Sequence, residues 1–219
     1  MNAKRVFLLD DHPVMRFGLT AIINAQNDLE ICGELGEGRG AVDHIRNAAP
    51  DVVILDLSLQ DASGLEVLKD LRRQEMRAPI LILSMRDETL YAERSLHCGA
   101  NGYIMKHEAT QHLIQALRTV LSGEVYLSAK MLAKMARAAA GIDSRDGTAT
   151  LSNLTDREFE VYELIGDGLV TREVADRLNI STKTVDTHRG RIKKKLGIGD
   201  VNELIRHAVR WAEAQSVSA

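Results

Sequence analysis

The 219-residue sequence contains two cysteines, three prolines and one tryptophan, and it has no apolar run long enough to span a membrane. Cys32 and Cys98 lack metal-ligand spacing, and two cysteines do not make the disulfide framework of a small secreted domain. The apolar stretch after Lys4 and Arg5 ends at Asp10, which makes it too short for a signal peptide. These absences predict a cytoplasmic protein without membrane contact.

Neither sign of charge prevails over the whole chain, since 28 lysines and arginines stand against 31 acids, a formal net charge of −3. Hydrophobic residues make up 45% and charged residues 27%, as in ordinary globular proteins. A chain of this length predicts two domains. The total charge therefore identifies no partner, and local clusters of charge must do so.

Short apolar runs alternate with longer amphipathic stretches as far as residue 121. The runs are bounded by turn residues, and the stretches have a period near 3.6, which is typical of strands and helices in a parallel sheet covered on both faces. The expected strands are RVFLL, LEICGEL, DVVIL, PILIL and GYIM, and the expected helices span 13–24, 39–47, 64–73, 88–98 and 110–121.

The second half of the chain shows no strand signal. AKMLAKMARAAA predicts an Ala-rich helix, and residues 141–150 have no apolar periodicity, which is typical of a linker. Four helices are expected after it, at 156–166, 171–178, 183–196 and 201–212. We therefore expect an α/β domain over 1–128, a helix and flexible linker over 129–151, and a small all-helical domain over 152–219.

Polar residues stand where the expected strands end: Asp10 and Asp11 after the first, Asp56 after the third, Ser84 at the fourth and Lys106 after the fifth. A single aspartate after a strand is usually a turn or cap residue. If strands one and three are neighbours, however, three carboxylates converge and repel by roughly 4 kcal/mol per pair at 4 Å for an effective dielectric near 20. A bound Mg²⁺ would offset this repulsion, and Asp56 could then act as a nucleophile.

This ordered set of residues resembles the receiver domains of two-component response regulators, over residues 4 to about 122. The resemblance implies a doubly wound five-stranded parallel sheet of order 2-1-3-4-5, phosphorylation of Asp56 by a sensor histidine kinase, and a requirement for Mg²⁺. The residues implied for phosphoryl transfer are Asp56, Ser84, Lys106 and Tyr103, and those for Mg²⁺ are Asp10, Asp11, Asp56 and the backbone carbonyl of Ser58.

The sequence departs from the receiver pattern at two positions. Gln60 stands where proline is expected, which changes the loop after Asp56, and His107 follows Lys106 where many receivers have proline. The isomer of the Lys106–His107 peptide stays open. His12, beside the acids, is open between a site contact and a surface residue.

A block of positive charge lies near the C-terminus, with six lysines or arginines and one acid between Lys183 and Lys195. On a helical wheel Val185, Ile192 and Leu196 form an apolar stripe, and the cations lie on the other side. Ser181 is a natural N-cap. A charge run is often only a solvated helix face. Gly190 nevertheless costs about 1 kcal/mol in a helix, and a surface that approaches closely would explain it.

The region from Leu154 to about Trp211 resembles the LuxR-type DNA-binding domain of the NarL/FixJ response regulators, through LTDREFEV, REVADRLNIS, KTVDTHRGRIKKKLGI and NELIRHAVRW. The resemblance implies a helix-turn-helix that binds double-stranded operator DNA. It places Asp186, Thr187 and Gly190 over base edges and Lys183, Thr184, Arg189, Arg191 and Lys194 on phosphates. Asp186 could accept from a cytosine, limit binding to wrong sequences, or only favour the helix N-terminus.

The last expected helix carries an apolar stripe that suits core packing. The resemblance also implies a homodimer in the active state, with contacts from Leu204, Ile205, Val209 and Trp211, and an inverted-repeat operator. RNA polymerase is a further candidate partner.

The prediction is a phosphorylation-controlled transcription regulator, not an enzyme. One rival is a phosphatase of the haloacid dehalogenase type, but Ser58 occupies the place of its second acid. The other is a LuxR regulator that senses a small molecule, or a receiver that acts without phosphorylation.

Overall fold

The computed structural model describes residues 3–140, 151 and 153–216, which fall into two compact units, Met1–Ala136 and Arg137–Ala219. The predicted linker over residues 141–150 lies outside the described residues. Within the described ranges, no helix has both the length and the apolar character to cross a bilayer.

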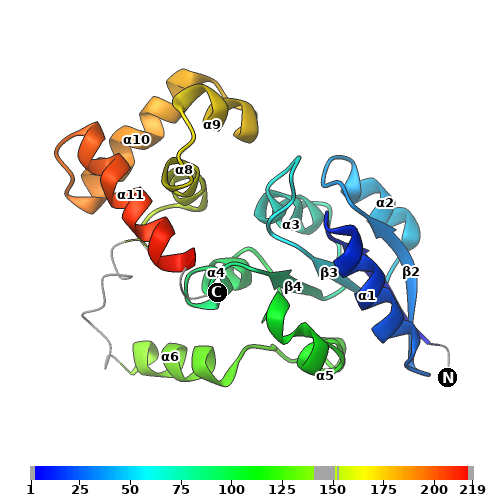
Figure 1. The fold of residues 1–219 in the computed structure, drawn as a ribbon. Coiled ribbons are helices and arrows are strands. Elements are labelled where there is room, and N and C mark those ends of the chain that lie inside the picture. The colour runs from blue at the N-terminus through cyan, green and yellow to red at the C-terminus, as the bar shows by residue number, and fades with distance from the viewer. Residues whose placement is uncertain (1–2, 141–150, 152, 217–219) are drawn as a thin grey trace. The chain divides into compact units, whose positions relative to one another are not determined.

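The first unit is built on a five-stranded parallel sheet of order β2-β1-β3-β4-β5 (Figure 1). This confirms the predicted fold class, and the strand ends agree with the expected runs to within one residue. The strands are β1 (Lys4–Leu9), β2 (Leu29–Leu35), β3 (Val52–Leu55), β4 (Ile80–Ser84) and β5 (Gly102–Met105).

Each strand of the first unit is followed by a helix. A short 3₁₀ helix, η1 (Lys106–Glu108), which the sequence pattern did not indicate, begins directly after β5. No cis peptide occurs in the described part of the chain, so the Lys106–His107 peptide is trans. The α-helices are α1 (Pro13–Asn24), α2 (Ala41–Ala48), α3 (Gly64–Arg73), α4 (Glu88–His97), α5 (Ala109–Leu121) and α6 (Ala129–Ala139).

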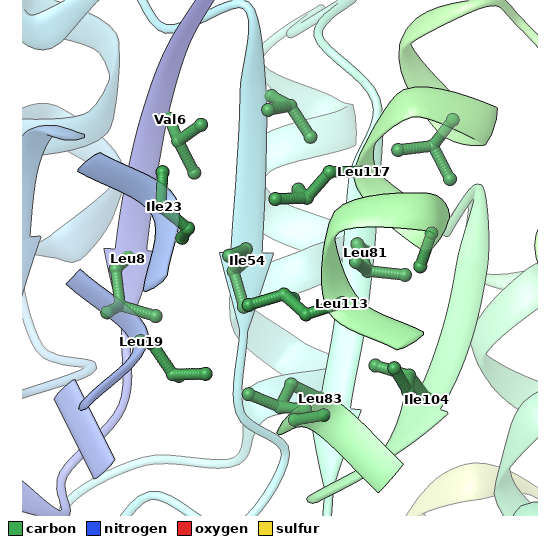
Figure 2. Packing of buried hydrophobic residues seen from close by; sticks show 14 of the residues in the cluster. Val6, Leu8, Leu19, Ile23, Ile54, Leu81, Leu83, Ile104, Leu113 and Leu117 are labelled. Atoms are coloured by element: carbon green, nitrogen blue, oxygen red, sulfur yellow. The ribbon is translucent and has the colours of Figure 1, made fainter. Parts of the chain in front are cut away.

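The main core lies between one face of the sheet and helices α1 and α5 (Figure 2). Burying ten such aliphatic side chains contributes on the order of 20 kcal/mol, which exceeds the cost of holding a few carboxylates together at the edge of the sheet. Phe7 and Leu9 alternate with the core residues Val6 and Leu8 on β1 and are also buried, so the other face is covered too. The ten labelled side chains are Val6, Leu8, Leu19, Ile23, Ile54, Leu81, Leu83, Ile104, Leu113 and Leu117.

The second unit is helical. The hydroxyl of Ser181 accepts a hydrogen bond from the backbone N–H of Thr184 at 3.1 Å, so Ser181 is the N-cap of α10, as its position suggested. Asn179, with a φ of 52°, makes the tight turn before it. Phe159 packs edge-on against Trp211, with ring centroids 5.7 Å apart. The helices are α8 (Asp156–Gly166), α9 (Thr171–Leu178), α10 (Thr182–Leu196) and α11 (Val201–Ser216).

Candidate functional site

Three carboxylates meet at the carboxyl edge of the sheet. Strands β1 and β3 are hydrogen-bonded neighbours with Leu9 opposite Leu55, so the residues that follow, Asp10 and Asp56, lie next to each other. One ligand atom from each of Asp10, Asp11, Asp56 and His12 lies within 4.8 Å of the others. The structure therefore brings together the acids that the sequence placed at separate strand ends.

Lys106 reaches into this acid pocket from the end of β5. Its Nζ lies 2.7 Å from Asp10 Oδ2 and 2.7 Å from Asp56 Oδ2, and its side chain is 3% exposed. Burial alone would lower the pKa of Lys106, but the hydrogen bonds to the two carboxylates outweigh burial and raise it. The side chain is therefore a buried ammonium group held by two acids.

The ionised pocket has an excess of negative charge. Burial raises the pKa of Asp56, and the hydrogen bonds from Lys106 and from the backbone N–H of Ser58 oppose this rise only in part. Three carboxylates and one ammonium leave two negative charges uncompensated, which suits a divalent cation.

Asp11 supplies the observation that tests whether a metal fits. Its side chain is 5% exposed, and its Oδ2 is buried without a hydrogen-bond partner among the described residues. A buried carboxylate oxygen without a donor is costly, and hard oxygen ligands are those that Mg²⁺ prefers. Asp10, Asp11 and Asp56 therefore fit a magnesium ion.

His12 is both exposed and in contact with the pocket. Its ring is 58% exposed, yet Nδ1 lies 2.6 Å from Asp11 Oδ1 and 3.2 Å from Asp10 Oδ1. The two interpretations that the sequence left open are thus both correct in part, because His12 lies at the rim of the pocket.

Arg86 connects the other predicted site residues. Its backbone N–H donates to Ser84 Oγ at 3.1 Å, and its carbonyl accepts from the Tyr103 hydroxyl at 2.7 Å. Its Nε donates to Ser58 Oγ at 3.1 Å. Tyr103 is fully buried, which raises the pKa of its hydroxyl. Sequence reasoning missed Arg86, since an arginine in a loop resembles any solvated arginine until its partners are known.

Gly64 determines how closely α3 approaches the acid pocket. A Cβ at Gly64 would lie 2.3 Å from the carbonyl oxygen of Asp56 and 2.5 Å from the Cα of Leu57. A side chain at this position would therefore displace the backbone that carries Asp56. Gln60, which stands where the receiver pattern has proline, is exposed and lies in the loop between β3 and α3.

The outer face of α10 is the second candidate site. Val185 and Ile192 are fully buried, so the opposite side of the helix faces solvent. Most of the predicted DNA contacts are exposed on that side: Lys183, Asp186, Thr187, Gly190, Arg191 and Lys194. We call these six residues the basic face.

Two predicted phosphate contacts are engaged inside the second unit. The side chain of Arg189 is 13% exposed and donates to Thr171 Oγ1 at 2.6 Å, which ties α10 to α9. The hydroxyl of Thr184 lies 2.8 Å from Ser181 Oγ. Their contacts with phosphate stay predictions, since each would have to release or share these bonds.

Lys195 also points inward, toward α8. Its Nζ lies 2.7 Å from Glu158 Oε2, whose side chain is 3% exposed. Burial would raise the pKa of Glu158, but the hydrogen bonds from Lys195 and Thr155 outweigh burial and lower it. Lys195 therefore stabilises the unit, although it belongs to the same run of lysines as Lys194.

The predicted dimer contacts on α11 have different environments. Leu204 is 0% exposed and packs within a single copy, where α11 lies on α8, so it offers no surface to a partner. Trp211 packs on Phe159 and on Tyr162, with ring centroids 5.7 and 5.4 Å apart. Ile205 and Val209 are partly exposed and remain the better candidates for a dimer contact.

Comparisons with known proteins assign each of the two units to a known family. Residues 6–118 match the family model of the response regulator receiver domain, and residues 152–208 match that of the luxR family of bacterial regulatory proteins. The oxygen regulatory protein NreC of Staphylococcus aureus (strain bovine RF122 / ET3-1) is 34% identical over 211 residues, which cover 94% of this chain and 97% of NreC.

Two solved structures are similar along nearly the whole chain. One is RcsB from Salmonella enterica serovar Typhimurium, bound to the promoter rprA in the presence of the phosphomimetic BeF₃⁻. It has a TM-score of 0.70 at 22% identity, and the match covers 95% of this chain and 99% of the RcsB chain. At this identity it supports the fold alone. The response regulator ChrA of a heme-sensing two-component system has a TM-score of 0.53 at 28% identity and covers 97% and 99%.

An α/β unit with an acid pocket is therefore joined to a helix-turn-helix, and each half matches its own family model while one relative matches nearly the whole length. The chain belongs to the NarL/FixJ family of DNA-binding two-component response regulators.

Proposed function

We propose that Asp56 accepts a phosphoryl group from a sensor histidine kinase and that this modification controls binding of the basic face to operator DNA. The observation that carries the proposal is the convergence of Asp10, Asp11 and Asp56 around the buried ammonium of Lys106. A structural ion pair would not need the excess negative charge of this pocket. Phosphoryl transfer, in contrast, requires a nucleophile, a cation site and a positive side chain together.

Each residue of the pocket has its own role in the proposed phosphoryl transfer. A carboxylate oxygen of Asp56 attacks the phosphorus, the P–N bond to the donor imidazole breaks, and the imidazole leaves with the electron pair and takes up a proton. The backbone N–H of Ser58 holds Asp56 Oδ1 at 2.9 Å, which orients the carboxylate. Lys106 and the hydroxyl of Ser84 would donate to the phosphoryl oxygens. A bound Mg²⁺, held by Asp10, Asp11, Asp56 and the carbonyl of Ser58, would neutralise the charge of carboxylates and phosphate.

For DNA, we propose that the cations of the basic face contact phosphates and release counterions, while Asp186, Thr187 and Gly190 face the bases. RcsB, a protein of the same fold, is bound to the rprA promoter in its solved structure, and we propose that DNA is the partner of this chain as well. A symmetric dimer through Ile205, Val209 and Trp211 would read an inverted repeat. RNA polymerase stays a further proposed partner, and a DNA partner places the action of the protein in the cytoplasm.

The domain boundaries are likewise proposals: a receiver domain over 1–128, a helix and linker over 129–151, and the DNA-binding domain over 152–219. In this arrangement the protein does not act as an enzyme on separate substrates; it modifies and reads its own Asp56.

The test is to incubate wild-type protein and Asp56→Asn with acetyl phosphate and Mg²⁺ and to measure the intact mass. Wild type should gain one phosphoryl group, and Asp56→Asn should gain none. Asp43→Asn, at an exposed acid on α2, is the matched control and should behave as wild type. Equal labelling of Asp56→Asn would contradict the assignment.

Other results would favour the rival functions. Phosphate release from small substrates in multiple turnovers would indicate a phosphatase. Affinity for operator DNA that is unchanged by phosphorylation, but altered by a metabolite, would indicate a regulator that senses a small molecule.

A further inference from the structure

The first turn of α4 binds the start of α6. Glu88 is a charged residue with only 8% of its surface exposed, and its Oε1 accepts a hydrogen bond from the backbone N–H of Ser128 at 2.9 Å. The hydroxyl of Ser128 donates to Glu88 Oε2. Lys134, further along α6, donates to the carbonyl of Thr89 at 2.9 Å. We call Glu88, Ser128 and Lys134 the α6 anchor.

The segment before α6 is also attached to the sheet. The backbone N–H of Tyr103 donates to the carbonyl of Tyr126 at 2.9 Å, and that of Tyr126 donates to the carbonyl of Asn101 at 3.1 Å. A Cβ at Gly102 would lie 2.9 Å from the carbonyl oxygen of Tyr126, so the backbone of β5 is in close contact with the backbone at Tyr126. The base of α6 is thus held from two sides, by β5 and by α4.

Helix α6 depends on these contacts for its order. It has 11 residues, and isolated helices of this length are marginal in water. Met131 is its buried residue, and the other α6 side chains are partly or fully exposed. The hydroxyl of Ser128 also accepts from the backbone N–H of Met131 at 3.1 Å, which caps the first turn. Loss of the anchor should therefore unfold α6 without unfolding the rest of the first unit.

The anchor is continuous with the acid pocket. Glu88 follows Arg86 by two residues and Ser84 by four, within one loop and the first turn of α4. Tyr103 connects the loop after β4 with the segment before α6. Its hydroxyl donates to the carbonyl of Arg86, and its backbone N–H donates to the carbonyl of Tyr126. A shift of Ser84 or Arg86 toward a phosphoryl group on Asp56 would therefore change the position of Glu88 and the base of α6.

We propose that the first turn of α4 is a docking surface for α6, with Glu88 as its anchor, and that this contact transmits the phosphorylation state of Asp56 toward the DNA-binding unit. This inference rests on the proposed function, because it adds the route to the phosphorylation and DNA binding assumed there. While α6 is docked on α4, a movement of α4 also moves α6. When α6 is released from α4, the movement is no longer passed on.

The experiment compares full-length wild type, Glu88→Ala, Glu88→Gln and, as the matched control, Glu93→Ala, which removes an exposed acid from the same helix. Each protein is studied with and without acetyl phosphate and Mg²⁺. Amide hydrogen exchange of the α6 peptides reports docking. Affinity is measured for a duplex that phosphorylated wild type selects from a random pool, and the ratio of affinities with and without phosphorylation reports the coupling.

In Glu88→Ala the α6 amides should exchange about tenfold faster, since the helix loses its anchor. The ratio of DNA affinities with and without phosphorylation should fall at least about fivefold. If the wild-type ratio is itself less than about fivefold, the ratio in the variant should fall to one. Asp56 should still gain its phosphoryl group. Glu88→Gln keeps an acceptor for the Ser128 N–H and should recover most of the ratio. Glu93→Ala should match wild type.

The failures are distinguishable. A wild type that gains no phosphoryl group, or whose affinity is the same in both states, contradicts the proposed function. A wild-type ratio that persists in Glu88→Ala, or α6 exchange that Glu88→Ala leaves unchanged, overturns the inference about the anchor alone. If Glu88→Ala no longer takes up phosphate, the double variant Ser128→Ala/Lys134→Met, which leaves α4 intact, replaces it with the same expected results.

Discussion

The acid pocket of the first unit and the basic face of the second differ in how their charges are treated. In the pocket, Asp10, Asp56 and Lys106 are almost fully buried, and the ammonium of Lys106 contacts both carboxylates. On the basic face, Lys183, Arg191 and Lys194 lie exposed on one helix. A buried charge affects folding as well as function, whereas an exposed one affects mainly binding. The two sites should therefore respond differently to substitution.

The largest effect is expected for Lys106→Met. Asp10 and Asp56 then lose the ammonium that both contact, and the free energy of unfolding of the first unit should fall by about 3 kcal/mol at neutral pH. Mg²⁺ should recover part of this loss, since a cation would again compensate the acids. Urea unfolding followed by circular dichroism, with and without Mg²⁺, measures both quantities.

The matched control for this change is Arg73→Met, at an exposed surface pair with Asp70, which should alter stability by less than about 0.5 kcal/mol. If Lys106→Met were as stable as wild type without Mg²⁺, the pocket would not hold its charges as described.

Lys195→Met sharpens the comparison, because Lys195 belongs to the basic run by sequence but pairs with the buried acid Glu158 in the structure. It should destabilise the second unit by about 1–2 kcal/mol at neutral pH, as it leaves the buried Glu158 unpaired. Fluorescence of Trp211, the one tryptophan, follows the unfolding of this unit, since the ring packs on Phe159.

The effect of Lys195→Met should depend on pH in a defined direction. In the folded protein the pKa of Glu158 lies below its ordinary value of about 4.3. The pair therefore stabilises the fold above that pH, and its contribution is lost as the pH falls through the folded pKa. The difference between wild type and variant should shrink in acid; a difference that is constant from pH 7 to pH 3 would contradict the ion pair.

Lys194→Ala tests the exposed side of the comparison. The variant should keep its stability, bind all duplexes more weakly, and reduce the slope of log affinity against log salt by roughly one, because one phosphate contact is lost. Salt titrations of binding, with Lys69→Ala as the control, measure the slope. Weaker binding to one operator alone would mean that Lys194 contacts a base.

The smallest effect is expected for Gly190→Ala. A Cβ at Gly190 meets no atom within 4 Å, so the domain itself does not need a glycine there. The variant should be more stable by roughly 0.5–1 kcal/mol, since alanine favours the helix, yet it should bind DNA more weakly if the base edges lie close. Greater stability with unchanged DNA affinity would remove Gly190 from the interface.

Regular features with a local cause were predictable from sequence. The strand runs, the helix periods and the Ser181 cap depend on neighbouring residues, and the structure reproduces them to within a few residues. Asp10, Asp56 and Lys106 could be expected at one edge, because parallel strands all end there. Arg86 and Glu88 could not be found in this way, since their partners Ser58 and Ser128 lie far away in the sequence.

The sequence by itself determined the two folds, the position of the acids and the helix that carries the basic face, because periodicity and strand ends are local properties. Only the tertiary structure decided that Arg189 and Lys195 point inward, that Leu204 belongs to the core, and that α6 is anchored to α4. The physical reason is that a position on a helix gives a direction around one axis, whereas the partner in that direction comes from a distant segment brought there by packing.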